Sequence, residues 1–367
     1  MKIKVLSQLL FLILFCTITV FAQEGKEVFT IEKEIKHLPV INQGSTGTCW
    51  SFATTSFLES EIIRKGFPET DLSEMYFVYF GYLNKAKKYL MYQGNSSFSQ
   101  GGQAHDVLDV LRQEGMVTYE AFPGEKVDGK YRHGDLVMEL KTEVDALNKK
   151  QDDFDAENLK SFKKILEKQI GKLPKKIKTE DGKVTPVDFV GKFDINPDDY
   201  LEISSYSHHP YYKPFVLEVP DNWAHGLYYN MPVDELLEIM YNSINKGFTV
   251  CWDGDTSEKT FAHKRGKAEL PEKQIGKVDQ DLRQETFNNR STTDDHLMHI
   301  VGLSKDSKGR NCFYTKNSWG AESNEYGGYL HITEDYVRLK TLAILVHKDA
   351  IPENIKQKLN LQCANLN

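Results

Sequence analysis

The chain has 367 residues, 40% of them hydrophobic and 27% charged, which is typical of a soluble globular protein of one large or two modest domains. Its formal net charge of −7 argues against nucleic acid as the main partner, because phosphate binding needs clustered Lys and Arg. No two of its five cysteines have the CxxC spacing of a zinc or redox site, so we expect no metal and no disulfide.

Residues 1–22 are predicted to be a signal peptide. Two lysines in MKIK precede an almost wholly apolar run, and Val20 and Ala22 stand at the −3 and −1 positions of a cleavage before Gln23. A membrane anchor is the alternative, because the run is about long enough to span a bilayer. The polar EGKE that follows favours cleavage. We therefore expect an exported protein, periplasmic or secreted, with no stable membrane anchor.

The first half of the mature chain is predicted to be mainly helical. Helical spacing of apolar residues predicts helices over 49–65, 71–92 and 103–114, and Gly66 and Gly115 mark the ends of the first and third. The Lys-, Glu- and Asp-rich block from 135 to 180 carries Leu, Phe and Ile at helical intervals. It is interpreted as exposed helices of an insertion with a solvated charged face.

After about residue 196 the chain is predicted to form strands, because short β-prone runs alternate with Gly, Pro, Asp and Asn. These runs are YLEISSYSH, FVLEV, FTVCWDG, LMHIVGL, CFYTKNSW, GYLHI and TLAILVH. One helix, 233–247, lies among them. Segregated helices and strands indicate an α+β protein with two lobes. Asp253 and Asp255 are assigned a loop role, since two carboxylates are too few to argue for a calcium site.

The stretch QGSTGTCWSF contains the candidate nucleophile, Cys49. The thiol is predicted to lie at a helix N-terminus, where unsatisfied N–H groups and the helix dipole favour a thiolate. Gln43 precedes it by six residues and offers an amide donor for an oxyanion, together with the Cys49 backbone N–H. A packed structural thiol is the alternative, because buried free cysteines are common.

A base and its orienting group are found near the C-terminus. In DDHLMHIVGL, His296 and His299 are three residues apart on a predicted strand, so they point to opposite faces and only one can reach a given cleft. In YTKNSWG, Asn317 offers an oxygen to one imidazole nitrogen, and Trp319 would keep water from that bond.

The order of these motifs resembles the papain-like cysteine peptidases over most of the mature chain. The resemblance rests on NQGSTGTCWSF, SQGGQAHDVLDVLRQEGM, DHLMHIVGL, FYTKNSWG and GYLHI. It implies an α+β papain-like fold, with the Cys on a helical lobe and the His and Asn on a β-barrel-like lobe. The family's catalytic His lies six residues before a Gly, a register that His296 and Gly302 match. His299 is then a packed residue.

The same resemblance implies the remaining roles. Cys49 is the nucleophile and His296 its partner, Asn317 orients the His, and Gln43 is the oxyanion donor. The supporting and substrate-binding positions implied by the family are Trp319, Asp295, Gly101, Gly102 and Trp50. Paired glycines let a substrate strand approach the backbone. No cofactor and no metal are implied.

Several features resemble one branch of the family, the C1B branch of bleomycin hydrolase and bacterial aminopeptidase C. Thr46 and Ser99 stand where extracellular papain relatives carry bonded cysteines, and the long insertion and RQETFNNRSTTDDHLMH are similar to that branch. Its members form hexameric rings in which a C-terminal carboxylate receives the substrate's free N-terminus. The tail after Pro352 is shorter here by several residues.

The sequence thus predicts an exported cysteine peptidase that acts on peptides and favours the aminopeptidase class. An open-cleft endopeptidase and an inactive peptide-binding protein are the alternatives. The predicted division is a signal peptide, 1–22, and a peptidase domain, 23–367, made of a mainly helical lobe, 23–134, a charged helical insertion, 135–195, a mainly β lobe, 196–350, and a C-terminal tail, 351–367.

Overall fold

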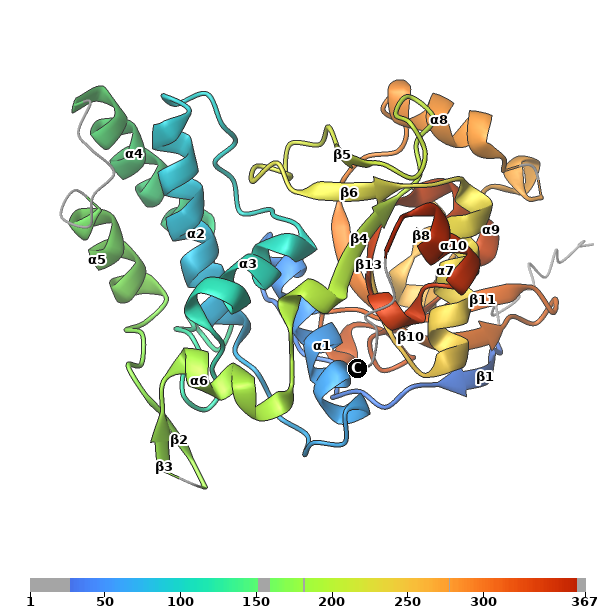
Figure 1. Cartoon of the computed structure of the whole chain (residues 1–367). Helices are drawn as coiled ribbons and strands as arrows, with labels where there is room; N and C mark the ends of the chain where they lie inside the picture. Colours follow the sequence, from blue (N-terminus) through green and yellow to red (C-terminus); the bar gives the residue numbers. More distant parts are fainter. Residues whose placement is uncertain (1–26, 151–158, 181, 277, 362–367) are drawn as a thin grey trace, which may run out of the picture.

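The computed structural model describes residues 27–150, 159–180, 182–276 and 278–361. The predicted signal peptide, Cys363 and the end of the predicted tail lie outside the described residues. Within these residues, none of the helices combines the length and apolar character needed to cross a bilayer. Figure 1 shows helices gathered on one side and a large sheet on the other, with α1 between them.

The helical side is built on three helices, α1 (Cys49–Arg64), α2 (Glu74–Met91) and α3 (Ala104–Glu114). The Ser73 hydroxyl caps α2 by accepting a bond from the Tyr76 N–H, and α3 ends at Gly115, whose φ of +82° favours glycine. Helix α1 is buried along nearly its whole length because it contacts α3 on one side and strand β10 on the other. It therefore holds its N-terminus between the two halves.

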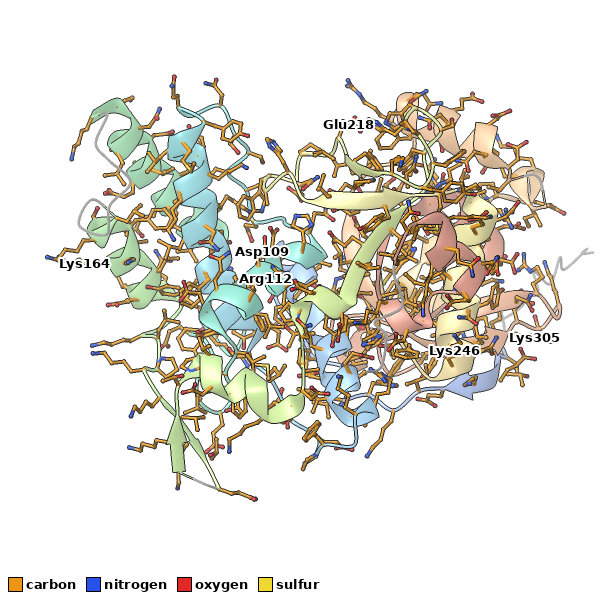
Figure 2. The ribbon with its side chains drawn as sticks, in the orientation of Figure 1. Asp109, Arg112, Lys164, Glu218, Lys246 and Lys305 are labelled. Carbon is orange, nitrogen blue, oxygen red and sulfur yellow. The ribbon has the colours of Figure 1, made fainter. Side chains whose placement is uncertain are left out.

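The charged segment after residue 134 adds two amphipathic helices, α4 (Gly134–Lys150) and α5 (Lys160–Gln169), that pack on α2. Their charged side chains, such as Lys164, point away from α2 (Figure 2). The prediction of helices up to residue 180 is wrong at its end. A hairpin of β2 (Ile177–Thr179) and β3 (Gly182–Val184) follows instead, because Pro174 is unfavourable in a helix interior.

The β side is one eleven-stranded sheet in the order β5-β6-β4-β13-β7-β10-β11-β12-β9-β8, and β1 pairs with β10. Within the described residues its end strands, β5 and β8, are not paired with each other, so the sheet is open rather than closed. The strands are β1 (Thr30–Glu34), β4 (Tyr200–Ser204), β5 (Pro214–Val216), β6 (Leu227–Asn230), β7 (Val250–Gly254), β8 (Phe261–Ala262), β9 (Lys267–Ala268), β10 (His296–Lys305), β11 (Asn311–Lys316), β12 (Tyr329–Thr333) and β13 (Thr341–His347).

Helices outside the helical side connect and cover the strands. They are α6 (Pro186–Val190), α7 (Val233–Lys246), α8 (Gln280–Asn288), α9 (Glu334–Lys340) and α10 (Glu353–Lys358). Short 3-10 turns occur at Gly191–Phe193, Pro197–Asp199, His263–Arg265, Glu272–Gln274, Ala321–Ser323 and Lys348–Ala350. The predicted helices at 49–65, 71–92, 103–114 and 233–247 are present to within a few residues, and the α+β class is confirmed.

The two faces of the central strands belong to different cores. Leu297 of β10 and Cys251 of β7 pack with the helical side, whereas Trp252 and Met298 pack into a second core on the opposite face. In the antiparallel register of β7 and β10, Leu297 lies opposite Asp253. Because side chains alternate along a strand, Asp253 shares the face of Cys251 that looks toward α1.

A buried ion pair stabilises the segment that leads into β10. Lys340 Nζ lies 3.0 Å from Asp255 Oδ2 and donates to the Ser291 carbonyl at 2.6 Å, and the Asp255 carboxylate also accepts the Thr293 N–H at 3.2 Å. We expect Lys340→Met to lower the free energy of unfolding by about 3–5 kcal/mol, because the buried Asp255 carboxylate loses its partner.

Chemical denaturation measures this effect, with Lys305→Met as the matched control. Lys305 pairs with Glu32 at 2.8 Å with a side chain that is 42% exposed, so water screens that pair and the loss should be much smaller. Equal losses for the two variants would contradict the role given to Lys340.

Candidate active site

Cys49 is the first residue of α1, as predicted, and its side chain is buried between the two halves. The preceding loop turns at Gly44, where φ is +66° and an added Cβ would lie 2.5 Å from the Tyr131 carbonyl oxygen. Burial raises the pKa of the thiol to about 12, while a hydrogen bond from the Leu297 backbone lowers it. The expected stabilisation of a thiolate at the helix N-terminus is therefore outweighed by desolvation.

His296 begins β10 and lies opposite Gly254 of β7. Its Nε2 is 2.8 Å from Oδ1 of Asn317. That oxygen also accepts the Ser318 N–H at 2.7 Å, which fixes the orientation of the amide and assigns the Nε2 hydrogen to the His. Burial lowers the pKa of His296 to about 4, opposed by the bond to Asn317. Both shifts favour the neutral forms of the thiol and the imidazole.

The Trp319 ring borders the imidazole of His296, and it also contacts the ring of His263. The Trp319 ring lies 4.9 Å from the His296 ring, between centroids, and 4.6 Å from the ring of His263. His263 Nδ1 is in turn 3.3 Å from the amide nitrogen of Asn317. The sequence prediction placed Trp319 here, but it missed His263, which has no recognisable motif and enters from the turn after β8.

Gln43 is tied to the same strand end. Its Oε1 accepts the Ser318 hydroxyl at 2.5 Å, its Nε2 donates to the Thr46 carbonyl at 2.7 Å, and its backbone N–H bonds the Ser318 carbonyl at 2.8 Å. These contacts hold the amide in one orientation. They also fasten the loop before Cys49 to the segment that carries Asn317.

Gly101, Gly102 and Trp50 form a packed unit on the helical side. A Cβ added to Gly101 would lie 1.7 Å from Oδ2 of Asp221, and one added to Gly102 would lie 3.1 Å from the Trp50 ring. Trp50 is 3% exposed and donates its indole N–H to the Gln100 carbonyl at 3.0 Å. A Cβ at either position would thus require a neighbouring side chain to shift, whereas contact of these residues with a substrate stays a prediction.

Asp295 and His299 lie beside the site rather than in it. Asp295 is exposed and accepts bonds from the Thr256 N–H at 3.1 Å and the Thr293 hydroxyl at 2.8 Å. His299 is buried, with Nδ1 2.9 Å from the Ser56 hydroxyl, and desolvation lowers its pKa. The packed environment predicted for His299 is therefore what the structure has.

The sequence interpretation missed a group of acids next to Cys49. After burial and the Leu297 bond, the charges that act on the Cys49 pKa are those of Asp253, Asp294 and Asp221, and all three raise it. The loop role predicted for Asp253 is wrong, because this residue belongs to β7 and is 3% exposed. Only long-range folding brings these positions together, so no local pattern signals them.

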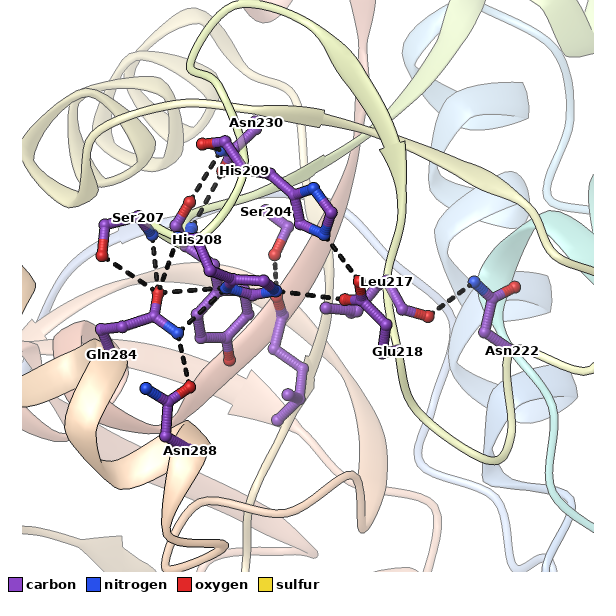
Figure 3. A network of polar contacts seen from close by, with 12 residues as sticks. Ser204, Ser207, His208, His209, Leu217, Glu218, Asn222, Asn230, Gln284 and Asn288 are labelled. Carbon is purple, nitrogen blue, oxygen red and sulfur yellow. Dashed lines mark hydrogen bonds and ion pairs between the residues drawn. The ribbon is translucent and has the colours of Figure 1, made fainter.

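Two groups among the described residues have the spacing of metal ligands. One is His208, His209 and Glu218, shown in Figure 3, and the other is Glu59, Asp71 and Glu74. Neither contains a predicted site residue. The expectation of a reaction without metal or cofactor stays a prediction. Cys49, Cys251 and Cys312 are free and buried.

The sequence is similar to a known protein family and to curated aminopeptidases. A family described as "Peptidase C1-like family" matches residues 14–367. The chain belongs to the Peptidase C1-like family. It is 23% identical to aminopeptidase G of Lactobacillus delbrueckii subsp. lactis, over 88% of this chain and 83% of that protein. It is 24% identical to aminopeptidase W of the same organism, over 93% of this chain and 87% of that protein.

More distant similarities agree with this assignment. The chain is 22% identical to the mitochondrial cysteine proteinase 1 of Saccharomyces cerevisiae strain JAY291, over 92% of this chain and 80% of that protein. The crystal structure of PepW from Lactobacillus rhamnosis HN001 superposes with a TM-score of 0.72 at 18% identity, over 90% of this chain and 85% of that one. The predicted papain-like α+β fold, C1B resemblance and cysteine-peptidase class are confirmed.

Proposed function

We propose that this family member is an exported aminopeptidase whose nucleophile is Cys49 and whose base is His296. The observation that carries the proposal is the hydrogen bond from Ser318 to Gln43, 2.5 Å long, which fastens the loop before Cys49 beside Asn317, the partner of His296. Helix α1, which Cys49 begins, also contacts strand β10, which His296 begins. The aminopeptidases among the similar proteins support the choice of exopeptidase, and residues 1–22 support export.

The proposed reaction follows from the neutral pair. His296 donates its Nε2 hydrogen to Asn317, so its Nδ1 lone pair is available for the thiol proton. As that proton leaves, sulfur forms a bond to the substrate carbonyl carbon and the carbonyl oxygen becomes an oxyanion. The imidazolium then protonates the leaving amine as the C–N bond breaks. Water adds to the thioester, His296 takes its proton, and the thiol is regenerated with release of the acid.

Gln43 and Trp319 support these steps in the proposal. The bond from Ser318 to Gln43 Oε1 fixes the amide, so that the second Nε2 hydrogen, not used by Thr46, is left for the oxyanion. The Trp319 ring beside His296 reduces access of water to the His–Asn bond. Peptides are the proposed substrates, and the hexameric ring stays a prediction that sedimentation can test.

The pKa values predict how Cys49 responds to pH. Burial holds the thiol pKa near 12, so its thiolate fraction should grow tenfold for each pH unit through the range 6 to 10. We expect the rate of Cys49 alkylation by iodoacetamide, located by peptide mapping, to rise steadily over that range. A preformed thiolate–imidazolium pair would instead give a plateau that begins at acid pH, which would contradict the neutral pair.

Paired fluorogenic substrates test the proposed function. Leucine coumarinylamide carries a free N-terminus, and its N-acetylated form does not. We expect hydrolysis of the first only, and its loss in Cys49→Ala but not in Cys312→Ala, because Cys312 is a buried free cysteine of β11 outside the site. Cleavage of the acetylated form at an equal rate would indicate an open-cleft endopeptidase. No Cys49-dependent turnover across a broad peptide panel would leave the inactive binding protein.

A further inference from the structure

Asp253 is a buried carboxylate with no compensating donor. It is 3% exposed, and within the described residues its oxygens meet no N–H or hydroxyl donor and no cation, only the carboxyl group of Asp294. Burying an unpaired charge is costly, so such groups either hold a proton or bind a cation. Burial and the neighbouring Asp294 charge raise the pKa of Asp253.

Two further acids, both partly exposed, act electrostatically on Asp253. Asp294 is partly exposed and accepts the Gln103 amide at 2.8 Å, and Asp221 is partly exposed with the Ser99 hydroxyl at 3.1 Å. Burial and the Asp221 charge raise the pKa of Asp294 to about 7. The three acids form a cluster around Cys49 in the sense that the charge of each acts on the thiol, and two of them are partly exposed.

The basic groups nearby do not neutralise this cluster. Lys85 donates to the carbonyls of Ser99 and Gly101, and His105 Nδ1 bonds Glu202 at 2.6 Å. Among the described residues, none of the three acids takes part in an ion pair with either base.

The loop that carries Asp221 is fixed by polar contacts on both sides. Figure 3 shows Asn222 bonded to the Leu217 carbonyl, at 3.0 Å, and Glu218 held by two imidazoles. His208 Nε2 and His209 Nε2 are 3.2 and 2.6 Å from the Glu218 carboxylate. Asn222 Oδ1 also accepts the Gly226 N–H at 2.8 Å. These contacts present Asp221 in a set position against Gly101.

We propose that Asp253, Asp294 and Asp221 form a subsite for an ammonium group, and that this group is the free N-terminus of the substrate. The inference rests on the proposed function. In an aminopeptidase the nitrogen of the first residue is two bonds, or about 2.5 Å, from the carbonyl carbon that sulfur attacks. The groups that bind this amine must therefore lie beside Cys49. Asp253 is on the face of β7 that looks toward α1, the helix that Cys49 begins.

An ammonium bound there also affects the chemistry. The three carboxylates oppose ionisation of Cys49, and a positive charge among them offsets that opposition. A free amine should thus raise kcat as well as lower KM. A blocked peptide supplies no charge and leaves the nucleophile in its less reactive, neutral state.

Isosteric amides test the subsite in the full-length protein. The measured quantity is the ratio of kcat/KM for leucine coumarinylamide to that for its N-acetyl form. We expect Asp253→Asn and Asp294→Asn to lower this ratio about 10- to 100-fold, the effect of a lost bond to a charged group. Asp109→Asn is the matched control, because Asp109 pairs with Arg112 on the outer surface of α3 (Figure 2) and should leave the ratio unchanged.

A binding measurement separates failure of this inference from failure of the proposed function. Calorimetry on Cys49→Ala protein compares L-leucinamide with N-acetyl-L-leucinamide and needs no turnover. We expect only the free amine to bind, and its affinity to fall about 10- to 100-fold when Asp253→Asn is added. Equal binding of both ligands, or an unchanged affinity in the double variant, would overturn the subsite.

A lysine side chain is the other source of an ammonium group. N-acetyl-Lys-Leu-coumarinylamide carries that group one residue further from the scissile bond. Cleavage of this peptide at the rate of the free amine, and dependent on Asp294, would assign the acids to side-chain recognition and overturn the N-terminal assignment. Failure to cleave it supports recognition of the α-ammonium group.

Discussion

Replacing His296 by Gln should lower kcat about 10²- to 10⁴-fold, whereas the same change at His299 should leave kcat within a few-fold of the parent value. The two residues are three positions apart on β10, yet only His296 bonds Asn317 and lies beside Trp319. Gln at position 296 keeps a polar side chain of similar size but cannot accept and return the thiol proton. Steady-state kinetics on the free-amine substrate measure both variants.

His299→Gln is the control for His296→Gln, and its expected effect is a loss of stability. Its ring is buried against the Ser56 hydroxyl, so His299→Gln is expected to reduce stability rather than catalysis. Thermal unfolding should show this loss, and kinetics at low temperature should show the retained activity. If His299→Gln abolished turnover in folded protein while His296→Gln did not, the assignment of the two histidines would be reversed.

Gln43→Ala should lower kcat about 10²- to 10³-fold with a smaller change in KM, because an oxyanion donor acts mainly in the transition state. The Gln43 amide is fixed by Ser318 and Thr46, so it needs little reorganisation when charge develops. Stopped-flow or steady-state assays of the free-amine substrate check this split between kcat and KM.

Ser318→Ala is the comparison variant for Gln43→Ala, and it should have a smaller effect on kcat. It removes the hydroxyl that holds Oε1 at 2.5 Å but leaves the donor in place, so the expected loss is only a fraction of that for Gln43→Ala. An effect of Gln43→Ala confined to KM would indicate ground-state binding. It would remove Gln43 from the proposed oxyanion site.

The candidate catalytic residues could be named from the sequence because each lies in a short motif that resembles the papain-like family. Cys49 follows a glycine-containing loop, His296 lies at the family's distance from a Gly, and Asn317 precedes a Trp by two residues. The main helices could be predicted because apolar periodicity and end signals are local.

Features set by distant contacts could not be predicted in this way. Asp253 lies in the predicted strand run FTVCWDG, yet it was assigned a loop role, and its burial opposite Leu297 depends on a strand pairing that the sequence does not show. Asp221 meets Gly101 across 120 positions of sequence, and no pattern in either segment signals the other. The β2–β3 hairpin is three residues on each side, which is too short for a periodic signal.

The ionisation of Cys49 also depends on contacts that the sequence does not show. A helix N-terminus is visible in the sequence, and it favours a thiolate. Burial between the two halves and the three nearby acids are not visible, and together they raise the thiol pKa to about 12. The balance of these effects depends on the tertiary structure.

Trapping the acyl-enzyme is the most direct test of the central claim that Cys49 is a nucleophile served by His296. The protein is mixed with the p-nitrophenyl ester of leucine, quenched with acid, and analysed by intact mass and peptide mapping. We predict one leucyl group per chain, on Cys49, absent in Cys49→Ala and formed at least 100-fold more slowly in His296→Gln. A leucyl group on Cys251 or Cys312, or turnover that persists in Cys49→Ala, would contradict the account.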